Sequence, residues 1–182
     1  GVYDLLKRKG YSVEPNVHCY TEHKPIWQIL NRYGFRTGIM NLPGTYPPEE
    51  IEGFMITGMM TPSERSSFSY PSNLAADLNS TVSKYEIDVP QWQYMDEGIF
   101  LKDVYKLTEK RFKAAEYLID SIFCDFYMIV FTSSDRLQHV LWEKREIVEN
   151  YWEDLDLIIG EILKLFGDET TVMVVSDHGF GP

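Results

Sequence analysis

Four residues of this chain have the types and the spacing of metal ligands. Asp135 and His139 are four residues apart, so on a helix their side chains share one face. Asp177 and His178 are adjacent and directly follow an apolar run. Carboxylate and imidazole groups together suit zinc or manganese better than calcium, which prefers oxygen ligands alone. The spacing therefore predicts a site for divalent cations built from two separate segments.

The two pairs can meet if the segments before them are strands of one parallel sheet. Residues 126–131 and 171–176 are both apolar without alternation, a pattern typical of strands covered on both faces. The carboxyl ends of parallel strands lie at the same edge of a sheet, where ligands gather. After the second run, Gly179 and Gly181 allow the sharp turn that adjacent side chains need to reach one ion. We therefore expect all four ligands at one edge of the sheet.

Each pair also has a simpler interpretation. Asp135 is well placed to cap a helix, and Asp177 with His178 can merely close a loop. The hydroxyl residues 132–134 resemble nucleophiles, but we expect them to cap exposed amides at a strand-to-helix turn.

The rest of the chain alternates between helix and strand signals. We predict helices at 3–9, 26–33, 73–78, 108–122 (with Thr108 as N-cap) and 148–166, and strands at 36–42, 54–57, 85–89, 126–131 and 171–176. This alternation predicts an α/β fold, with a mostly parallel sheet and helices on both faces.

The stretch 43–107 differs from its surroundings. Six of the nine prolines fall between Pro43 and Pro90, among many Ser, Thr, Tyr and Asn residues, and this density interrupts long elements. We interpret it as an irregular insertion or lid in a single α/β domain, residues 1–182, whose core is 1–42 and 108–182. A surface excursion without a role is the alternative.

Bulk composition narrows the class of protein. The chain has 182 residues, 44% of them apolar, and a net charge of −11. Such a charge argues against a nucleic-acid polymer as partner, and an acidic protein acting on a small phosphorylated substrate needs metal ions to offset repulsion. No apolar run approaches the ~20 residues of a membrane span, so we expect no membrane partner and a cytoplasmic location.

The remaining cysteines and histidines suggest no second site. Cys19 and Cys124 match no zinc or redox spacing, and we expect both to be reduced thiols. His18 and His23 lie on a polar stretch, and we interpret both as ordinary surface residues.

The candidate ligands resemble those of the alkaline phosphatase superfamily, in particular the archaeal members of its type I phosphodiesterase/nucleotide pyrophosphatase branch. The resemblance rests on Asp135 with His139 and on the later Asp177-His178-Gly179. It extends to residues 27–34, to Pro-Gly-Thr-Tyr-Pro-Pro at 43–48 and to Gly-Met-Met-Thr-Pro at 58–62. It covers nearly the whole chain and implies an alkaline-phosphatase-like core.

This resemblance implies two divalent metal ions, zinc or manganese, and an in-line displacement at phosphorus. By analogy Asp135 and His139 bind one ion with a further downstream histidine, while Asp177 and His178 bind the other with an upstream aspartate. The family also uses a nucleophilic Thr or Ser, which has no match here and which we expect upstream of Gly1. The chain is thus interpreted as an internal part of a catalytic domain, inactive alone.

Three functions remain open. The first is metal-dependent hydrolysis of phosphate esters, of the phosphodiesterase or nucleotide pyrophosphatase type. The second is a phosphomutase of the same superfamily, which returns the phosphoryl group to the substrate. The third is a non-catalytic acidic interaction domain, which binds no metal.

Overall fold

The computed structural model describes residues 6–15, 24–89 and 96–181. Its first element is an antiparallel hairpin of β1 (Leu6–Lys9) and β2 (Ser12–Pro15). The helix predicted at 3–9 is therefore wrong for its described part. Gly10 takes a φ of +65° between the two strands, a conformation open to glycine, and this reverses the chain.

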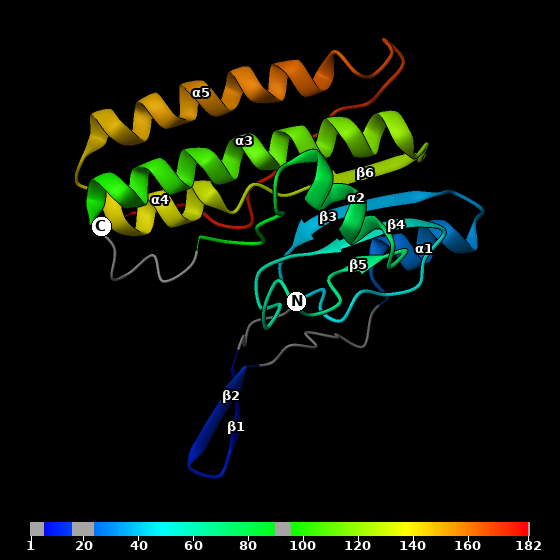
Figure 1. Cartoon of the computed structure of the whole chain (residues 1–182), viewed down its shortest axis with the longest axis horizontal. Helices are drawn as coiled ribbons and strands as arrows, with labels where there is room; N and C mark the ends of the chain where they lie inside the picture. The colour runs from blue at the N-terminus through cyan, green and yellow to red at the C-terminus, as the bar shows by residue number, and fades with distance from the viewer. Residues whose placement is uncertain (1–5, 16–23, 90–95, 182) are drawn as a thin grey trace.

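A four-stranded sheet forms the centre of the body (Figure 1). Its strands are β3 (Thr37–Leu42), β4 (Gly53–Thr57), β5 (Ser69–Tyr70) and β6 (Phe126–Ile129). Their spatial order is β5-β4-β3-β6, with β3 parallel to both β4 and β6 and only β5 antiparallel. The predicted strands at 36–42, 54–57 and 126–131 are thus confirmed, and so is the mostly parallel α/β fold.

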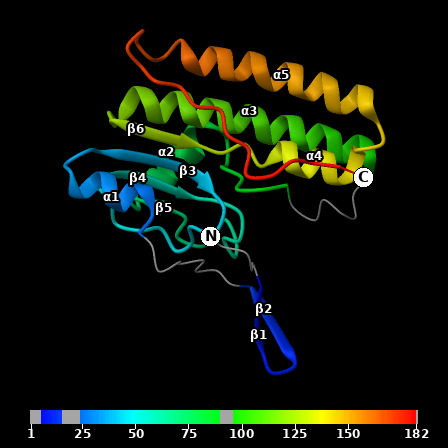
Figure 2. The same ribbon diagram turned by 180° about the vertical axis from the view of Figure 1, so that it is seen from behind.

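Within the described ranges, five helices accompany the sheet. They are α1 (Ile26–Arg32), α2 (Leu74–Thr81), α3 (Glu97–Ser121), α4 (Ser133–Leu141) and α5 (Arg145–Leu163). Helix α1 covers one face, where Trp27 packs with Ile39 and Met55 of the strands. Helices α2 and α3 cover the other, where Met40 and Phe54 point, and α5 packs beyond α3 (Figures 1 and 2). Alternation along the strands thus produces the predicted covering of both faces.

Helix α3 begins well before the predicted start at Thr108. Asp96 caps it, because its carboxylate accepts hydrogen bonds from the amides of Gly98 and Ile99. Buried residues continue the helical spacing through this first part: Phe100, Val104, Leu107. Thr108 lies inside the helix, where its hydroxyl donates to the Val104 carbonyl.

Two predicted strands are absent. Residues 85–89 form no ladder, although alternate side chains (Tyr85, Ile87 and Val89) are buried. Residues 171–176 follow α5 without secondary structure, and their apolar side chains lie in solvent, with Val174 80% exposed. Apolar and β-branched residues form a strand only where a neighbouring strand is available for pairing. Neither 85–89 nor 171–176 has such a neighbour among the described residues.

The stretch 43–107 supplies β4 and β5, and β4 lies between β5 and β3. This part of the stretch is in the sheet, and the division into core and lid stays a prediction. No described helix is long and apolar enough to cross a membrane.

Candidate functional site

Asp135 lies in the first turn of α4, beside the edge at which β3 and β6 end. His139 follows one turn later, and its Nε2 lies 3.3 Å from Asp135 Oδ1. The helical spacing predicted from sequence therefore does place both side chains on one face. Asp135 does not cap the helix: the N-cap position is Thr132, three residues earlier.

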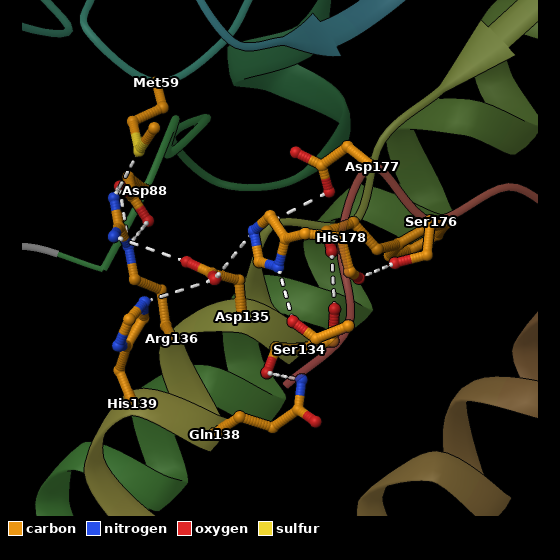
Figure 3. Close-up of polar contacts among 12 residues, drawn as sticks. Met59, Asp88, Ser134, Asp135, Arg136, Gln138, His139, Ser176, Asp177 and His178 are labelled. Atoms are coloured by element: carbon orange, nitrogen blue, oxygen red, sulfur yellow. Dashed lines mark hydrogen bonds and ion pairs between the residues drawn. The ribbon is translucent and has the colours of Figure 1, made fainter. Parts of the chain in front are cut away.

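One residue of the second pair of candidate ligands, His178, lies near the same carboxylate. His178 Nε2 lies 4.0 Å from Asp135 Oδ1 and 3.8 Å from Asp177 Oδ1 (Figure 3). The oxygen Oδ1 of Asp135 thus faces two imidazoles, one from its own helix and one from the C-terminal segment. The structure brings together all four residues singled out from the sequence, even though 171–176 is no strand.

Ring packing holds the C-terminal segment against α4. The Phe180 ring lies 4.9 Å from the His139 ring and 5.1 Å from the Trp142 ring. Asp177 itself remains 91% exposed at its side chain, and His178 57%. The second pair is thus placed by an aromatic contact just beyond it, and its own side chains stay in solvent.

The environment of His178 favours its charged form. The pKa of His178 is raised above the ordinary 6.5, first because its ring Nδ1 bonds the Gly179 carbonyl at 2.8 Å. The charge of Asp177 raises it further, and partial desolvation acts in the opposite direction. Only a neutral imidazole binds a metal, so a raised pKa works against cation binding at this position.

Buried hydroxyls fix the first turn of α4. The side-chain oxygens of Thr108, Ser133 and Tyr151 form a closed triangle, with separations of 2.8 to 2.9 Å. These three residues are at most 2% exposed and come from α3, α4 and α5. Because these hydrogen bonds join three helices, they hold the first turn of α4, which carries Asp135, in place.

The hydroxyls near the site are poorly suited to act as nucleophiles. Ser133 is buried in the triangle, Ser134 Oγ donates to the Phe131 carbonyl at 3.0 Å, and Thr132 Oγ1 is buried with no partner. Residues 132–134 therefore do belong to the strand-to-helix turn, but the predicted capping of amides is wrong. Thr45 is 8% exposed and bonds the Leu42 carbonyl at 2.7 Å.

Arg136 and Asp88 belong to the same cluster, and sequence reasoning missed both. Arg136 Nε lies 3.1 Å from each carboxylate oxygen of Asp88, and its Nη1 lies 3.6 Å from Asp135 Oδ2. Burial alone lowers the pKa of Arg136, but the hydrogen bonds and charge of Asp88 outweigh it and raise that pKa. In the sequence, the only indication that Arg136 belongs to the cluster is that it directly follows Asp135.

Two loops with family-like sequences lie at the ends of β3 and β4. The Gly44 amide donates to the Met59 carbonyl at 3.1 Å, and the Gly58 amide donates to Thr45 Oγ1 at 3.2 Å. Gly58 has no room for a side chain, since a Cβ would lie 2.3 Å from the Asn41 carbonyl oxygen. Met59 Sδ accepts from Arg136, which joins these loops to the cluster (Figure 3).

The donor set suits a transition metal in its chemistry, because two carboxylates and two imidazoles converge. Its present spacing is wider than a closed site: within the described ranges, no three His, Cys, Asp or Glu side chains are grouped to hold one ion. His18, His23 and Cys19 lie outside those ranges. A cleft of about 440 Å³ between α3 and α5 contains none of the four candidate ligands in its lining.

Comparison with known protein families shows to which family the chain belongs. The family model described as type I phosphodiesterase / nucleotide pyrophosphatase matches residues 2–182. The chain belongs to this family. The α/β sheet is consistent with an alkaline-phosphatase-like fold, and membership indicates an enzyme of the phosphodiesterase or nucleotide pyrophosphatase type. Searches of curated proteins and of solved structures gave no match.

Proposed function

We propose that this chain provides part of a metal-dependent site that hydrolyses phosphate esters of the phosphodiester or nucleotide pyrophosphate type. The observation that carries the proposal is the convergence of two imidazoles on Asp135 Oδ1, at 3.3 and 4.0 Å. Family membership over residues 2–182 supports the reaction type.

In this proposal Asp135 and His139 hold one divalent cation, zinc or manganese, and Asp177 and His178 hold a second. When bound, such cations stabilise the negative charge that develops on the oxygens of the phosphoryl group. The protein's own task is to fix the carboxylates, to keep the imidazoles neutral and to present one face to the substrate. The pKa of His178 is raised, so this imidazole binds a cation only after it has lost its proton.

The nucleophile is proposed to come from outside residues 1–182. The motivation is that Thr45 and Ser133, hydroxyls at the sheet edge, are buried and already hydrogen-bonded. We expect the chain alone to turn over bis(4-nitrophenyl) phosphate slowly or not at all. Robust turnover that disappears in Ser133→Ala or Thr45→Val would contradict this part of the proposal.

Calorimetric titration with Mn²⁺ and with Zn²⁺ tests the cation site itself. We expect binding to the wild-type chain and a loss of at least about tenfold in affinity for Asp135→Asn, which removes the shared carboxylate. Asp120→Asn is the matched control, since Asp120 is exposed at the far end of α3. Equal affinities for wild type, Asp135→Asn and Asp120→Asn would rule the site out and favour an acidic interaction domain.

A further inference from the structure

We propose that Asp88 is a positioning residue, which takes the hydrogen bonds of the Arg136 guanidinium and limits its contact with Asp135 to a longer ion pair, so that the Asp135 carboxylate stays available to a cation. The inference rests on the proposed function of Asp135. It gives the 43–107 stretch a specific part in the site.

The first support is the unequal sharing of one guanidinium between two carboxylates. Arg136 Nε lies 3.1 Å from both oxygens of Asp88, and Nη2 also donates to Asp88 Oδ2. Nη1 lies 3.6 Å from Asp135 Oδ2, which is longer than a hydrogen bond (Figure 3). Arg136 is therefore hydrogen-bonded to Asp88, whereas with Asp135 it forms only a longer ion pair.

The second support is burial, which makes the choice of partner matter. The side chains of Arg136, Asp88 and Asp135 are 12%, 22% and 32% exposed. Charge-assisted hydrogen bonds strengthen as water is excluded, and the guanidinium edge formed by Nε and Nη2 can bind a carboxylate with two parallel bonds. A guanidinium released from Asp88 thus has a strong reason to engage the neighbouring carboxylate.

The third support is that Asp88 is itself fixed. The Val89 amide donates to Asp88 Oδ1 at 2.9 Å, and Val89 is 3% exposed. On the other side, the Ile87 carbonyl accepts from Nη2 of the buried Arg111 at 2.9 Å. Because both neighbours are anchored in the core, Asp88 offers a stationary partner.

The consequence concerns the two oxygens of Asp135. Oδ1 faces the imidazoles of His139 and His178, while Oδ2 faces Arg136. A guanidinium bound to Asp135 would neutralise the ligand and compete directly with a divalent cation. By holding the hydrogen-bonding edge of Arg136, Asp88 limits that competition.

A metal-free measurement tests the change of partner: solvent exchange of the Arg136 Nε proton, followed by NMR. We expect slow exchange in the wild type and in Asp135→Asn, and continued protection in Asp88→Ala because Asp135 captures the guanidinium. The double variant Asp88→Ala/Asp135→Asn should exchange at least about tenfold faster than Asp88→Ala, since neither carboxylate then binds the Nε proton. Rapid exchange in Asp135→Asn alone, or in Asp88→Ala alone, would overturn the inference.

Titration with Mn²⁺ alone tests the consequence for the cation. Asp88→Ala should weaken binding by about tenfold or more, and Asp88→Ala/Arg136→Gln should bind as tightly as Arg136→Gln. Asp120→Ala serves as the control for loss of one acidic charge. An equal loss from Asp88→Ala in the Arg136→Gln background would show that Asp88 acts through its own charge, against the inference. If the exchange pattern holds and no variant binds Mn²⁺, the proposed function fails and the restraint of Arg136 stands.

Discussion

Asp135 and His139 lie on a helix whose first turn is fixed by buried contacts, whereas Asp177 and His178 lie on a segment without secondary structure. Beneath the first pair, Ser133 is hydrogen-bonded to α3 and α5 and is 2% exposed. In the second segment, Val174 is 80% exposed. The two halves of the candidate site, the α4 half (Asp135 and His139) and the C-terminal half (Asp177 and His178), thus have the same types of side chain. They differ in how firmly the backbone beneath them is packed.

This difference shows that having the right side chains for a cation is one requirement and holding them in place is another. A site binds and reacts well when its groups are held in place by rigid elements, and the α4 half meets that condition. The C-terminal half reaches the site through Phe180, which packs on His139 and Trp142. Segments with few buried contacts open at low free energy, so the C-terminal half should be the adjustable one.

The largest expected contrast is in stability. Leu137 on α4 is fully buried, so Leu137→Ala should lower the free energy of unfolding by about 2–5 kcal/mol. Val174→Ala, in the exposed segment, should change it by no more than about 0.5 kcal/mol. Urea unfolding followed by circular dichroism measures both. Equal losses would show that 171–176 is as well packed as α4.

Thiol reactivity provides the next contrast. Burial raises the pKa of Cys124, just before β6, from 9.0 to about 11, with Arg36 acting against it and Asp125 with it. In a Cys19→Ser chain, the Cys124 thiolate fraction at pH 7.5 should be about 100-fold lower than that of a free thiol. A chain with Cys19→Ser, Cys124→Ser and Val174→Cys should react with a thiol reagent at the rate of a free thiol.

The same shift fixes a sign for stability against pH. A raised pKa in the folded state means that the neutral thiol is favoured there, so its contribution is present below pH 9 and is lost as the pH rises towards 11. Comparable labelling rates at pH 7.5 for Cys124 and for the thiol introduced by Val174→Cys would contradict the contrast between the buried core and the exposed C-terminal segment.

The smallest expected effect concerns the hydroxyl triangle. Tyr151→Phe removes the oxygen that joins Thr108 and Ser133, and those two keep only each other in the triangle. We expect a loss of about 1–2 kcal/mol in urea unfolding, as for a buried hydrogen-bonded group. Tyr33→Phe is the control, because Tyr33 is 78% exposed. A neutral Tyr151→Phe would mean that the first turn of α4 has other supports.

The sequence predicted a helix or strand correctly where the residue pattern within the segment is enough to determine it. The strands at 37–42 and 126–129 and the helix at 145–163 follow from apolar runs or helical periodicity. The start of α3 was missed because a proline-rich neighbourhood hid the cap at Asp96. Residues 171–176 were misjudged because a strand also needs a paired neighbour, which composition does not reveal.

The candidate site divides in the same way. The spacing of Asp135 and His139 predicts their shared face, since both lie on one helix. Asp88 was not predictable, because its pairing with Arg136 depends on how 85–89 packs beside α4. Long-range pairs of this kind leave no periodic trace in a single sequence.

The central claim is that two distant acid–imidazole pairs form neighbouring sites for two cations at the sheet edge, and anomalous diffraction from crystals soaked in Zn²⁺ tests it most directly. The account predicts zinc within about 2.0–2.2 Å of ligand atoms of Asp135 and His139, and a second zinc similarly close to Asp177 and His178. Zinc bound elsewhere on the chain, with these four side chains uncoordinated, would contradict it.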